Sequence, residues 1–438
     1  MFDEALHYLL SLGHETLAIK LGLANTERLL AALGHPQSSF RCVQIAGTNG
    51  KGSTAVMLES ICRAAGIRTG LYTSPHLISI TERVRIAGRE ITREEFGRLT
   101  WRVRAVARRL LAAGELETLP TFFEHLTAIA LLAFREAHVE LAILETGMGG
   151  RLDATTAARA ALVAITPVDL DHQEYLGETL AEIAAEKAAI IRPGVRVIVA
   201  PQAPAALEVI LRRCDSCGVV PVLNECRATA QDDADSKGHM RVSFETARDS
   251  YENVRLGLRG RHQMTNACVA ISLAEALREG GFDIPRAAVR EGLEEARHAG
   301  RLELRAGPPA LLFDGAHNRA GARALRSFLD EFVREEPLTM LFGAMRDKDL
   351  NEIAATLFPA ADRLILTAPS NPRAATPEAL ARTAAPYLDA DKISLAPLSA
   401  DALEAAYGLT PAHGLICVTG SLYLVGEVSE VLQRAGKA

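Results

Sequence analysis

The chain has 438 residues, with 48% hydrophobic and 23% charged side chains and a formal net charge of −6. This composition is typical of a globular protein large enough to form two domains. The acidic balance argues against a general nucleic-acid-binding protein, and no uninterrupted apolar run reaches membrane-spanning length.

Helical and strand patterns alternate along the first two thirds of the chain. Two helices are predicted within residues 3–33, and another begins at Ser53. Further helices are predicted at residues 93–113, 119–134, 179–191 and 260–276. Apolar, β-prone runs predict buried strands at residues 42–45, 67–72, 139–144, 161–166 and 195–200. This alternation predicts right-handed βαβ units and a mostly parallel sheet.

The pattern changes after residue 226. Residues 227–258 are polar, and the alternating runs at 239–244 and 253–258 predict an antiparallel hairpin at the edge of the sheet. The charged segment 294–300 is the predicted linker. Beyond it, new strands are predicted at residues 310–313, 338–342, 363–367 and 415–419.

The most informative stretch is residues 41–53, RCVQIAGTNGKGS, in which a strand leads into a glycine-rich turn and a helix. Converging backbone N–H groups, the helix dipole and the charge of Lys51 predict an anion cradle. Ser53 or Thr54 can offer a hydroxyl to a phosphate-bound Mg²⁺. Ile45 stands where the common P-loop has its first glycine. We interpret the stretch as a variant ATP site rather than a turn without a ligand.

These features predict an α/β protein of two domains. Residues 1–296 are expected to form a P-loop ATPase-like domain with a mostly parallel sheet and a small antiparallel part. Residues 297–438 are expected to form a smaller Rossmann-like α/β domain.

Several polar residues fall where predicted strands end: Lys51, Ser53, Ser74, Glu145 and His172. Ligands of open parallel sheets bind beyond the carboxyl ends of the strands, so we expect these side chains to share one rim. A carboxylate such as Glu145 can hold Mg²⁺ near a triphosphate. Taken singly, an acid at a strand end is equally consistent with simple exposure to solvent, and for His172 alone we favour an ordinary loop histidine.

Lys187 lies among apolar helical residues. Two interpretations remain open from the sequence. The ammonium group can stabilise the helix C-terminus and reach water, or its apolar surroundings can lower its pKa and leave a reactive amine. In the second half, Asp314 and His317 follow a predicted strand and Arg301 follows the linker. These three suit contacts to a nucleotide or to a transferred phosphoryl group.

The seven cysteines are scattered, which favours a reducing cytoplasm. Cys214, Cys217, Cys226 and His239 are four candidate zinc ligands. Their second pair is irregularly spaced, so we favour plain thiols over a zinc site.

The sequence resembles a known family through a series of motifs in one order: GTNGKGS, TSPHL, ETGMGGRLDAT, DHQEYLG with AEIAAEKAAII, GRHQMTNA, GRLE and FDGAHN. The series is similar to that of the dihydrofolate synthase/folylpolyglutamate synthase branch of the Mur ligases. The resemblance implies ATP-dependent amide formation. A carboxylate is phosphorylated to an acyl phosphate, which the amino group of L-glutamate attacks. The acceptors implied are dihydropteroate and reduced folates.

The resemblance also implies roles for individual residues. ATP-binding residues are implied at Thr48, Asn49, Gly50, Lys51, Gly52, Ser53, Asn266, Arg301, Asp314 and His317. Two Mg²⁺ ions are implied at Ser53, Ser74, Glu145, His172 and Lys187, with Lys187 carbamylated. The implied catalytic residues are Lys51, Lys187, Asp314 and His317. The resemblance implies that Thr121, Phe123 and Asp153 bind the pterin. Thr156 stands where the family pattern has Asn, and we expect it to alter the pterin pocket.

Three alternatives are weighed against this interpretation. One is a folylpolyglutamate synthase without the second activity. Another is a peptidoglycan ligase of the Mur type, although the phosphate loop begins near Gly47, where no nucleotide-sugar domain precedes it. The third is a P-loop switch or transport ATPase, which would leave Lys187 and Asp314 without a role. We expect a cytoplasmic monomer that binds ATP, L-glutamate and a pterin substrate, without nucleic acid or membrane partners.

Overall fold

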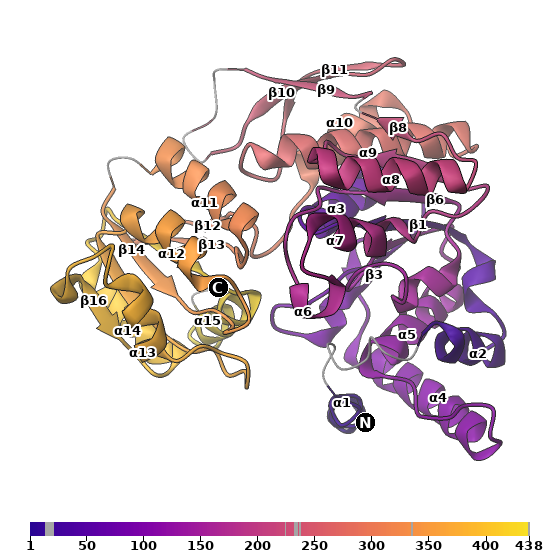
Figure 1. Cartoon of the computed structure of the whole chain (residues 1–438), viewed down its shortest axis with the longest axis horizontal. Helices are drawn as coiled ribbons and strands as arrows, with labels where there is room; N and C mark the ends of the chain where they lie inside the picture. The colour runs from indigo at the N-terminus through magenta and orange to yellow at the C-terminus, as the bar shows by residue number, and fades with distance from the viewer. Residues whose placement is uncertain (14–21, 224, 232–234, 236–237, 334–335, 437–438) are drawn as a thin grey trace.

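The computed structural model describes all residues except 14–21, 224, 232–234, 236–237, 334–335 and 437–438. Residues 14–21, which belong to the predicted N-terminal helices, therefore lie outside the described residues. The described chain contains an N-terminal part with two sheets and a C-terminal part with a third sheet, and these two parts lie side by side (Figure 1). The predicted α/β class is confirmed.

The central sheet of the N-terminal part has eight strands, six of them parallel, with an antiparallel pair at one edge. In spatial order the strands are β4 (Arg89–Glu90), β3 (Val84–Ile86), β2 (Thr69–Tyr72), β5 (Leu141–Glu145), β1 (Arg41–Ala46), β6 (Leu162–Ile165), β7 (Arg196–Val199) and β8 (Val222–Leu223). All the predicted strands of this part are present, and β1 lies in the middle. The phosphate loop therefore starts from the centre of the sheet.

Helices cover both faces of this sheet because its residues point alternately to opposite sides. In β1, Val43 and Ile45 pack on one face and Cys42 and Ala46 on the other. The first face is covered by α3 (Lys51–Ala64), α9 (His262–Glu279) and α10 (Arg286–Glu295). The core on the second face includes side chains of α1 (Phe2–Leu10), α2 (Ala24–Ala32), α4 (Arg93–Ala112), α5 (Phe122–Glu136), α7 (Leu180–Ala188) and α8 (Pro204–Ser216).

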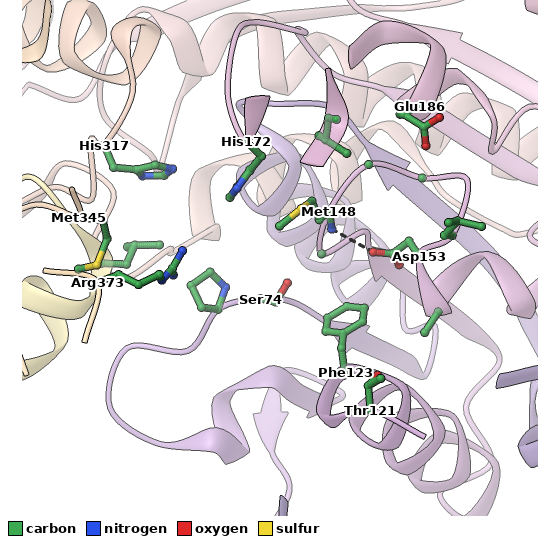
Figure 2. Close-up of a pocket in the computed structure, with 18 of the residues that line it drawn as sticks. Ser74, Thr121, Phe123, Met148, Asp153, His172, Glu186, His317, Met345 and Arg373 are labelled. Atoms are coloured by element: carbon green, nitrogen blue, oxygen red, sulfur yellow. Dashed lines mark hydrogen bonds between the residues drawn. The ribbon is translucent and has the colours of Figure 1, made fainter. Parts of the chain in front are cut away.

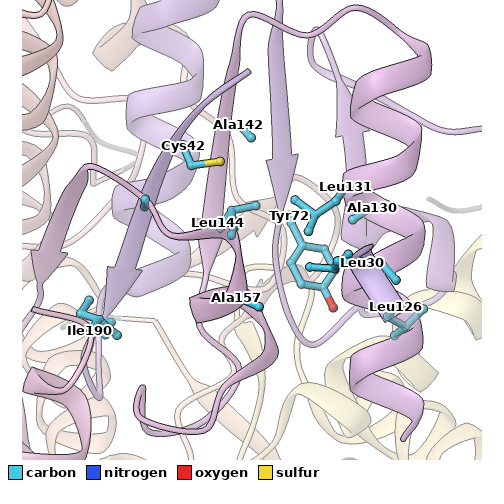
Figure 3. Close-up of a cluster of buried hydrophobic side chains, with 14 of the residues drawn as sticks. Leu30, Cys42, Tyr72, Leu126, Ala130, Leu131, Ala142, Leu144, Ala157 and Ile190 are labelled. Atoms are coloured by element: carbon cyan, nitrogen blue, oxygen red, sulfur yellow. The ribbon is translucent and has the colours of Figure 1, made fainter. Parts of the chain in front are cut away.

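Tyr72 of β2 shows how this second core is filled. Its ring is fully buried and packs beside Leu30, Leu126 and Leu131 (Figure 3). The core is continuous from α2 through α5 to the sheet, so the strand ends that carry the polar residues are held by a rigid layer.

The predicted hairpin at the edge of the central sheet is wrong in its position. The segment forms a separate antiparallel sheet, with β9 (Arg227–Ala230), β10 (Arg241–Glu245) and β11 (Ser250–Arg255). Its apolar side, with Val242, Phe244 and Val254, belongs to the core formed with α9 and α10. The three strands lie above α9 and α10 in Figure 1. Their alternating pattern therefore buries one face against these helices and does not extend the main sheet.

The C-terminal part contains a six-stranded sheet with one antiparallel edge strand. Its strands in order are β12 (Glu303–Arg305), β13 (Ala310–Phe313), β17 (Leu415–Thr419), β14 (Leu338–Phe342), β15 (Arg363–Leu366) and β16 (Ile393–Leu395). One face packs against α11 (Arg319–Phe332), α12 (Leu350–Leu357) and α13 (Pro377–Ala384), and the other against α14 (Ser399–Leu409) and α15 (Leu422–Arg434). No helix in the described residues is long and apolar enough to cross a bilayer.

The two parts are joined by the chain between α10 and β12 and touch each other directly. The predicted linker 294–300 begins too early, because α10 continues through Glu295. The predicted division after residue 296 falls in this connection and stays a prediction. Near it, a Cβ atom at Gly426 of α15 would overlap the carbonyl oxygen of Leu77 in the N-terminal part. The absence of a side chain at Gly426 thus allows α15 to rest on that loop.

Candidate active site

The phosphate loop follows β1 and ends in the N-terminus of α3. Gly50 caps the helix with φ 87°, in the left-handed region that favours glycine. A Cβ atom there would also clash with Asn266 Oδ1. The helix starts at Lys51, two residues before the predicted Ser53, because the left-handed turn at Gly50 lets the next residues adopt helical geometry. The first N–H groups of the helix have no partner within the helix, as the predicted anion cradle requires.

Lys51 curls back over the loop that carries it. Its Nζ donates to the carbonyl oxygens of Gly47 and Thr48, both at 3.1 Å. Burial lowers the pKa of Lys51, and the nearby Glu145 carboxylate opposes this shift. The ammonium group is therefore held at the loop, where it can meet a phosphate.

A cleft of about 340 Å³ opens between this loop and the C-terminal part. It brings together every residue predicted to bind ATP or metal. These residues are Thr48, Asn49, Gly50, Lys51, Gly52, Ser53, Ser74, Glu145, His172, Lys187, Asn266, Arg301, Asp314 and His317. The expectation that the strand ends share one rim is confirmed.

Glu145 ends β5 beside the phosphate loop. Its Oε2 accepts a hydrogen bond from the Ser74 backbone N–H at 3.1 Å. Burial raises the pKa of Glu145, whereas the Lys51 ammonium lowers it. The described residues contain no cluster of three or more His, Cys, Asp and Glu side chains suited to a metal.

Lys187 of α7 points into the cleft rather than toward water. The side chain is 4% exposed, and its Nζ donates to Gly47 O at 2.8 Å. Burial, followed by the charge of Lys51, lowers the pKa of Lys187 to about 7. Burial also lowers the pKa of His172 to about 3, so this imidazole is neutral. The surroundings of Lys187 thus match the interpretation as a reactive amine.

Asp171 is a central residue that the sequence did not single out as a site residue. Its carboxylate lies 2.6 Å from Lys348 Nζ and 3.1 Å from Asn318 Nδ2, both in the C-terminal part. Burial would raise the pKa of Asp171, but the neighbouring His317 and the charges around the carboxylate hold its pKa well below its usual value. Asp171 adjoins the predicted His172, whereas no motif signals Lys348.

On the other side of the cleft, Asp314 and His317 follow β13. Both Asp314 oxygens accept backbone hydrogen bonds at 2.9 Å, from Leu302 and Ala316. His317 Nδ1 lies 2.7 Å from Gly315 O, and its Nε2 lies 3.6 Å from Asp171. Asp314 therefore shapes the strand end, while His317 faces the N-terminal part.

A second cavity of about 190 Å³ contains all three residues predicted to hold the pterin, Thr121, Phe123 and Asp153. Figure 2 shows Phe123 on one side and Arg373, Met345 and His317 from the C-terminal part on the other. The two cavities share a wall formed by Ser74, Pro75, Gly147, Met148, His172, His317 and Leu422.

The three predicted pterin residues differ in their local bonding. Thr121 caps α5 by accepting from the Glu124 N–H, and Asp153 accepts from Met148 N and Thr155 N at 3.0 Å. The side-chain oxygens of Thr121 and Asp153 therefore accept hydrogen bonds from the nearby backbone. The ring of Phe123, in contrast, faces the cavity (Figure 2).

Thr156, the departure from the family pattern, does not line the second cavity. Its hydroxyl donates to Gly150 O at 2.8 Å and accepts from Gln44 at 2.7 Å. Because Gly150 is part of the cavity wall, Thr156 acts on the cavity through the loop that it supports.

The four candidate zinc ligands do not form a site. Cys214 is buried in the core on one face of the central sheet, and Cys226 packs against the core on the other face. His239 Nδ1 lies 3.0 Å from Leu256 O. No metal-type cluster is present among the described residues, which favours plain thiols.

Comparison with known proteins shows the family to which this chain belongs. Residues 45–274 match the Mur ligase middle domain, and residues 300–422 match the Mur ligase glutamate ligase domain. The chain is 34% identical over 428 residues to the dihydrofolate synthase/folylpolyglutamate synthase of Bacillus subtilis, covering 96% of this chain and 97% of that protein. The chain belongs to this branch of the Mur ligases.

Another relative of this folate branch is a longer protein. The chain is 35% identical to a probable bifunctional folylpolyglutamate synthase/dihydropteroate synthase of Haloferax volcanii. The match covers 99% of this chain and spans about half of that protein, 51% of its length.

Solved structures of the folate branch share the whole fold. The Mycobacterium tuberculosis folylpolyglutamate synthase complexed with ADP has a TM-score of 0.90 at 31% identity and covers 98% of each chain. An Escherichia coli enzyme in complex with DHPP and ADP has a TM-score of 0.87 at 29% identity, covering 99% of this chain and 98% of that one. A bifunctional enzyme with Mn, AMPPNP and L-glutamate bound has a TM-score of 0.84 at 28% identity, covering 99% and 98%.

The prediction of an ATP-dependent glutamate ligase of the folate branch is therefore confirmed. The peptidoglycan ligase and the switch ATPase are set aside, because the matched relatives over nearly the full chain are folate enzymes. Nucleotide and divalent metal belong to the chemistry of this branch.

Proposed function

We propose that this Mur ligase adds L-glutamate to dihydropteroate and to reduced folates. The carboxylate of the acceptor attacks the γ-phosphorus of ATP and ADP leaves, which gives an acyl phosphate. The glutamate amine then attacks the acyl carbon, forms the amide and releases phosphate. The main support for this proposal is that the two cavities adjoin. An acceptor carboxylate in one cavity would then lie close to a nucleotide phosphate in the other.

The nucleotide is assigned to the larger cleft. The N–H groups of the phosphate loop and the ammonium of Lys51 bind the phosphates. Arg301, Asp314 and His317 contact the nucleotide or its transferred group from the opposite wall, which is supported by their place in the same cleft. A preorganised cation such as Arg301 stabilises charge that develops during phosphoryl transfer.

Two Mg²⁺ ions are proposed in this cleft, where they would neutralise phosphate charge. Ser53 and Glu145 suit the first, because a hydroxyl and a carboxylate are oxygen ligands of the kind that Mg²⁺ prefers. Ser74, His172 and Lys187 are proposed for the second. His172 is neutral because burial lowers its pKa, as a nitrogen ligand requires.

Lys187 is proposed to be carbamylated. Its neutral amine attacks CO₂, forms an N–C bond and loses a proton, which turns a cationic side chain into an anionic oxygen ligand. Two features support this modification. The amine is buried, and burial lowers its pKa to about 7, so a large fraction is neutral near that pH.

L-glutamate is proposed to bind where the C-terminal part faces the shared wall. Lys348 and Arg373 line this side of the second cavity, and their positive charges suit the carboxylates of an amino acid. An amine bound there lies next to His317 and the wall that the acyl phosphate would reach.

Oxygen labelling tests this function. With ¹⁸O in the carboxylate of the acceptor, the released phosphate should carry one ¹⁸O atom, because that oxygen bridges to phosphorus in the acyl phosphate. Unlabelled phosphate would contradict the intermediate. Glutamate-dependent ADP release should occur with dihydropteroate and with tetrahydrofolate. Turnover of tetrahydrofolate alone would reduce the proposal to folylpolyglutamate synthase activity.

The enzyme is further proposed to act as a cytoplasmic monomer. All seven cysteines are free thiols, as expected in a reducing compartment. Sedimentation of the active enzyme should give the mass of one chain. Any other mass would contradict the monomer.

A further inference from the structure

His298 contacts the phosphate loop from the connection between the two parts. Its Nδ1 lies 3.3 Å from Ser53 Oγ, although 245 residues separate them in the sequence. The residue lies between the end of α10 at Glu295 and the start of β12 at Glu303. None of the roles assigned above involves His298.

The other contacts of Ser53 determine what His298 can do. Gln263 Nε2 donates to Ser53 Oγ at 3.4 Å, and Asn266 Nδ2 holds Gln263 by donating to its Oε1 at 2.8 Å. Ser53 Oγ therefore accepts one hydrogen bond from α9, which leaves its own hydrogen to be donated elsewhere. His298 Nδ1 is the neighbour that can accept it.

The ring of His298 can supply the acceptor. A neutral imidazole has one ring nitrogen that accepts and one that donates. With Nδ1 as the acceptor, the ring takes the hydrogen of the Ser53 hydroxyl.

His298 also lies close to the carboxylate proposed for the same cation. A Cβ atom at Gly52 would lie 2.8 Å from His298 Cε1 and 3.3 Å from Glu145 Oε2. The imidazole and the carboxylate therefore flank the same residue of the first turn of α3, and the lack of a side chain at Gly52 leaves room for both.

We propose that His298 is a positioning residue for the cation at Ser53 and Glu145. It accepts the hydrogen of the Ser53 hydroxyl, so that the lone pairs of Oγ face the cation. Because His298 belongs to the connection between the two parts, the placement of that connection is coupled to the affinity of the metal site. This inference rests on the proposed metal site.

Metal affinity, rather than turnover, is the primary measurement. Mn²⁺ binding to the enzyme with AMPPNP is followed through the electron paramagnetic resonance of free Mn²⁺. His298→Ala should weaken binding about 10- to 100-fold, the range for groups that orient metal ligands. His298→Asn places an amide oxygen near the position of Nδ1 and should restore much of the affinity. His298→Gln places that oxygen one carbon too far and should not.

The Asn and Gln variants have similar polarity, so their comparison decides the question even if the Ala variant fails to fold. His413→Asn, at an exposed histidine of the C-terminal part, is the matched control and should bind Mn²⁺ like the wild type. Equal affinity in the Asn and Gln variants would overturn the positioning role. So would a loss limited to Mn²⁺ with Mg²⁺ affinity unchanged, because direct nitrogen ligation favours the transition metal.

Two further variants separate this inference from the metal site on which it rests. Ser53→Ala and Glu145→Gln should each weaken Mn²⁺ binding. If neither does, the proposed metal site is wrong and His298 loses its role with it. If both do but His298→Ala and His298→Gln bind Mn²⁺ like the wild type, the metal site stands and the inference about His298 is overturned.

Discussion

The ammonium group of Lys348 lies 2.6 Å from the carboxylate of Asp171, and the two side chains are only 9% and 8% exposed. Lys348 follows β14 in the C-terminal part, whereas Asp171 follows β6 in the N-terminal part. A buried ion pair therefore joins the two parts at the edge of the larger cleft. It is stable only while the parts are together, because separation exposes both charges to water.

Lys348→Met should shift the enzyme toward an open arrangement. Leaving the buried carboxylate without this partner costs about 1–3 kcal/mol, or about 5- to 150-fold in the ratio of closed to open molecules. Small-angle scattering with AMPPNP and folate should give a larger radius of gyration than for the wild type. Lys392→Met, at an exposed ion pair with Asp389, should not change it. Equal compactness of Lys348→Met and wild type would contradict closure through this pair.

Lys51→Ala should abolish most turnover and leave the fold intact. Removing one preorganised charge from a transferring phosphoryl group costs about 2.7–4 kcal/mol, or roughly 10²–10³ in rate. Single-turnover ATP cleavage measures the loss, and circular dichroism checks the fold. A folded variant with near-normal cleavage would mean that the loop is not the phosphate site.

Lys187→Ala should lower turnover by at least about tenfold. Losing a group that only orients a metal ligand already costs about that much, and Lys187 is proposed to be a ligand itself. Short carboxylic acids such as acetate should partly restore it, since they can occupy the space of the carbamate. No rescue at any acetate concentration, together with an unmodified amine by intact-mass analysis under CO₂, would argue against carbamylation.

The same modification predicts a pH dependence. The lowered pKa of about 7 means that the amine is neutral above that pH and protonated below it. Because CO₂ adds only to the neutral amine, wild-type activity should fall as the pH decreases through about 7, and added bicarbonate should raise it there. The residual activity of Lys187→Ala should not respond to bicarbonate.

Phe123→Ala and Thr121→Ala should have different effects although the residues are neighbours. Phe123→Ala removes a ring that faces the second cavity, so KM for the folate should rise while KM for ATP stays constant. Thr121→Ala removes the cap of α5, which costs about 0.5–2 kcal/mol of stability. Its melting temperature should fall, whereas a selective rise in folate KM would show that Thr121 contacts the substrate.

Local sequence patterns were sufficient to predict much of this fold and of the candidate site. Strand, turn and helix around GTNGKGS were predictable because the three glycines and Lys51 act within a few residues of one another. The shared rim followed from the parallel sheet, which places Glu145 and His172 at the same edge. Contacts between distant segments were not predictable. Nothing local marks Lys348 as the partner of Asp171, or His298 as the partner of Ser53.

The three-stranded sheet shows the same limit. Its alternating residues revealed strands but not their partners, because the apolar face of β10 is equally suited to a sheet edge or to helices. The choice is made by α9 and α10, whose buried side chains meet Val242 and Phe244. Such packing depends on segments that are far apart in the sequence.

The wall shared by the two cavities has a consequence for inhibitor design. On the proposed assignment, one molecule with a pteridine at one end and a phosphonate at the other would occupy both cavities, which adjoin at Ser74, Gly147 and His172. Linking two weak binders in this way makes the second contact intramolecular and can raise affinity by about 10²–10⁴ over either one. A bisubstrate compound of this kind would need a linker that matches the distance between the two cavities.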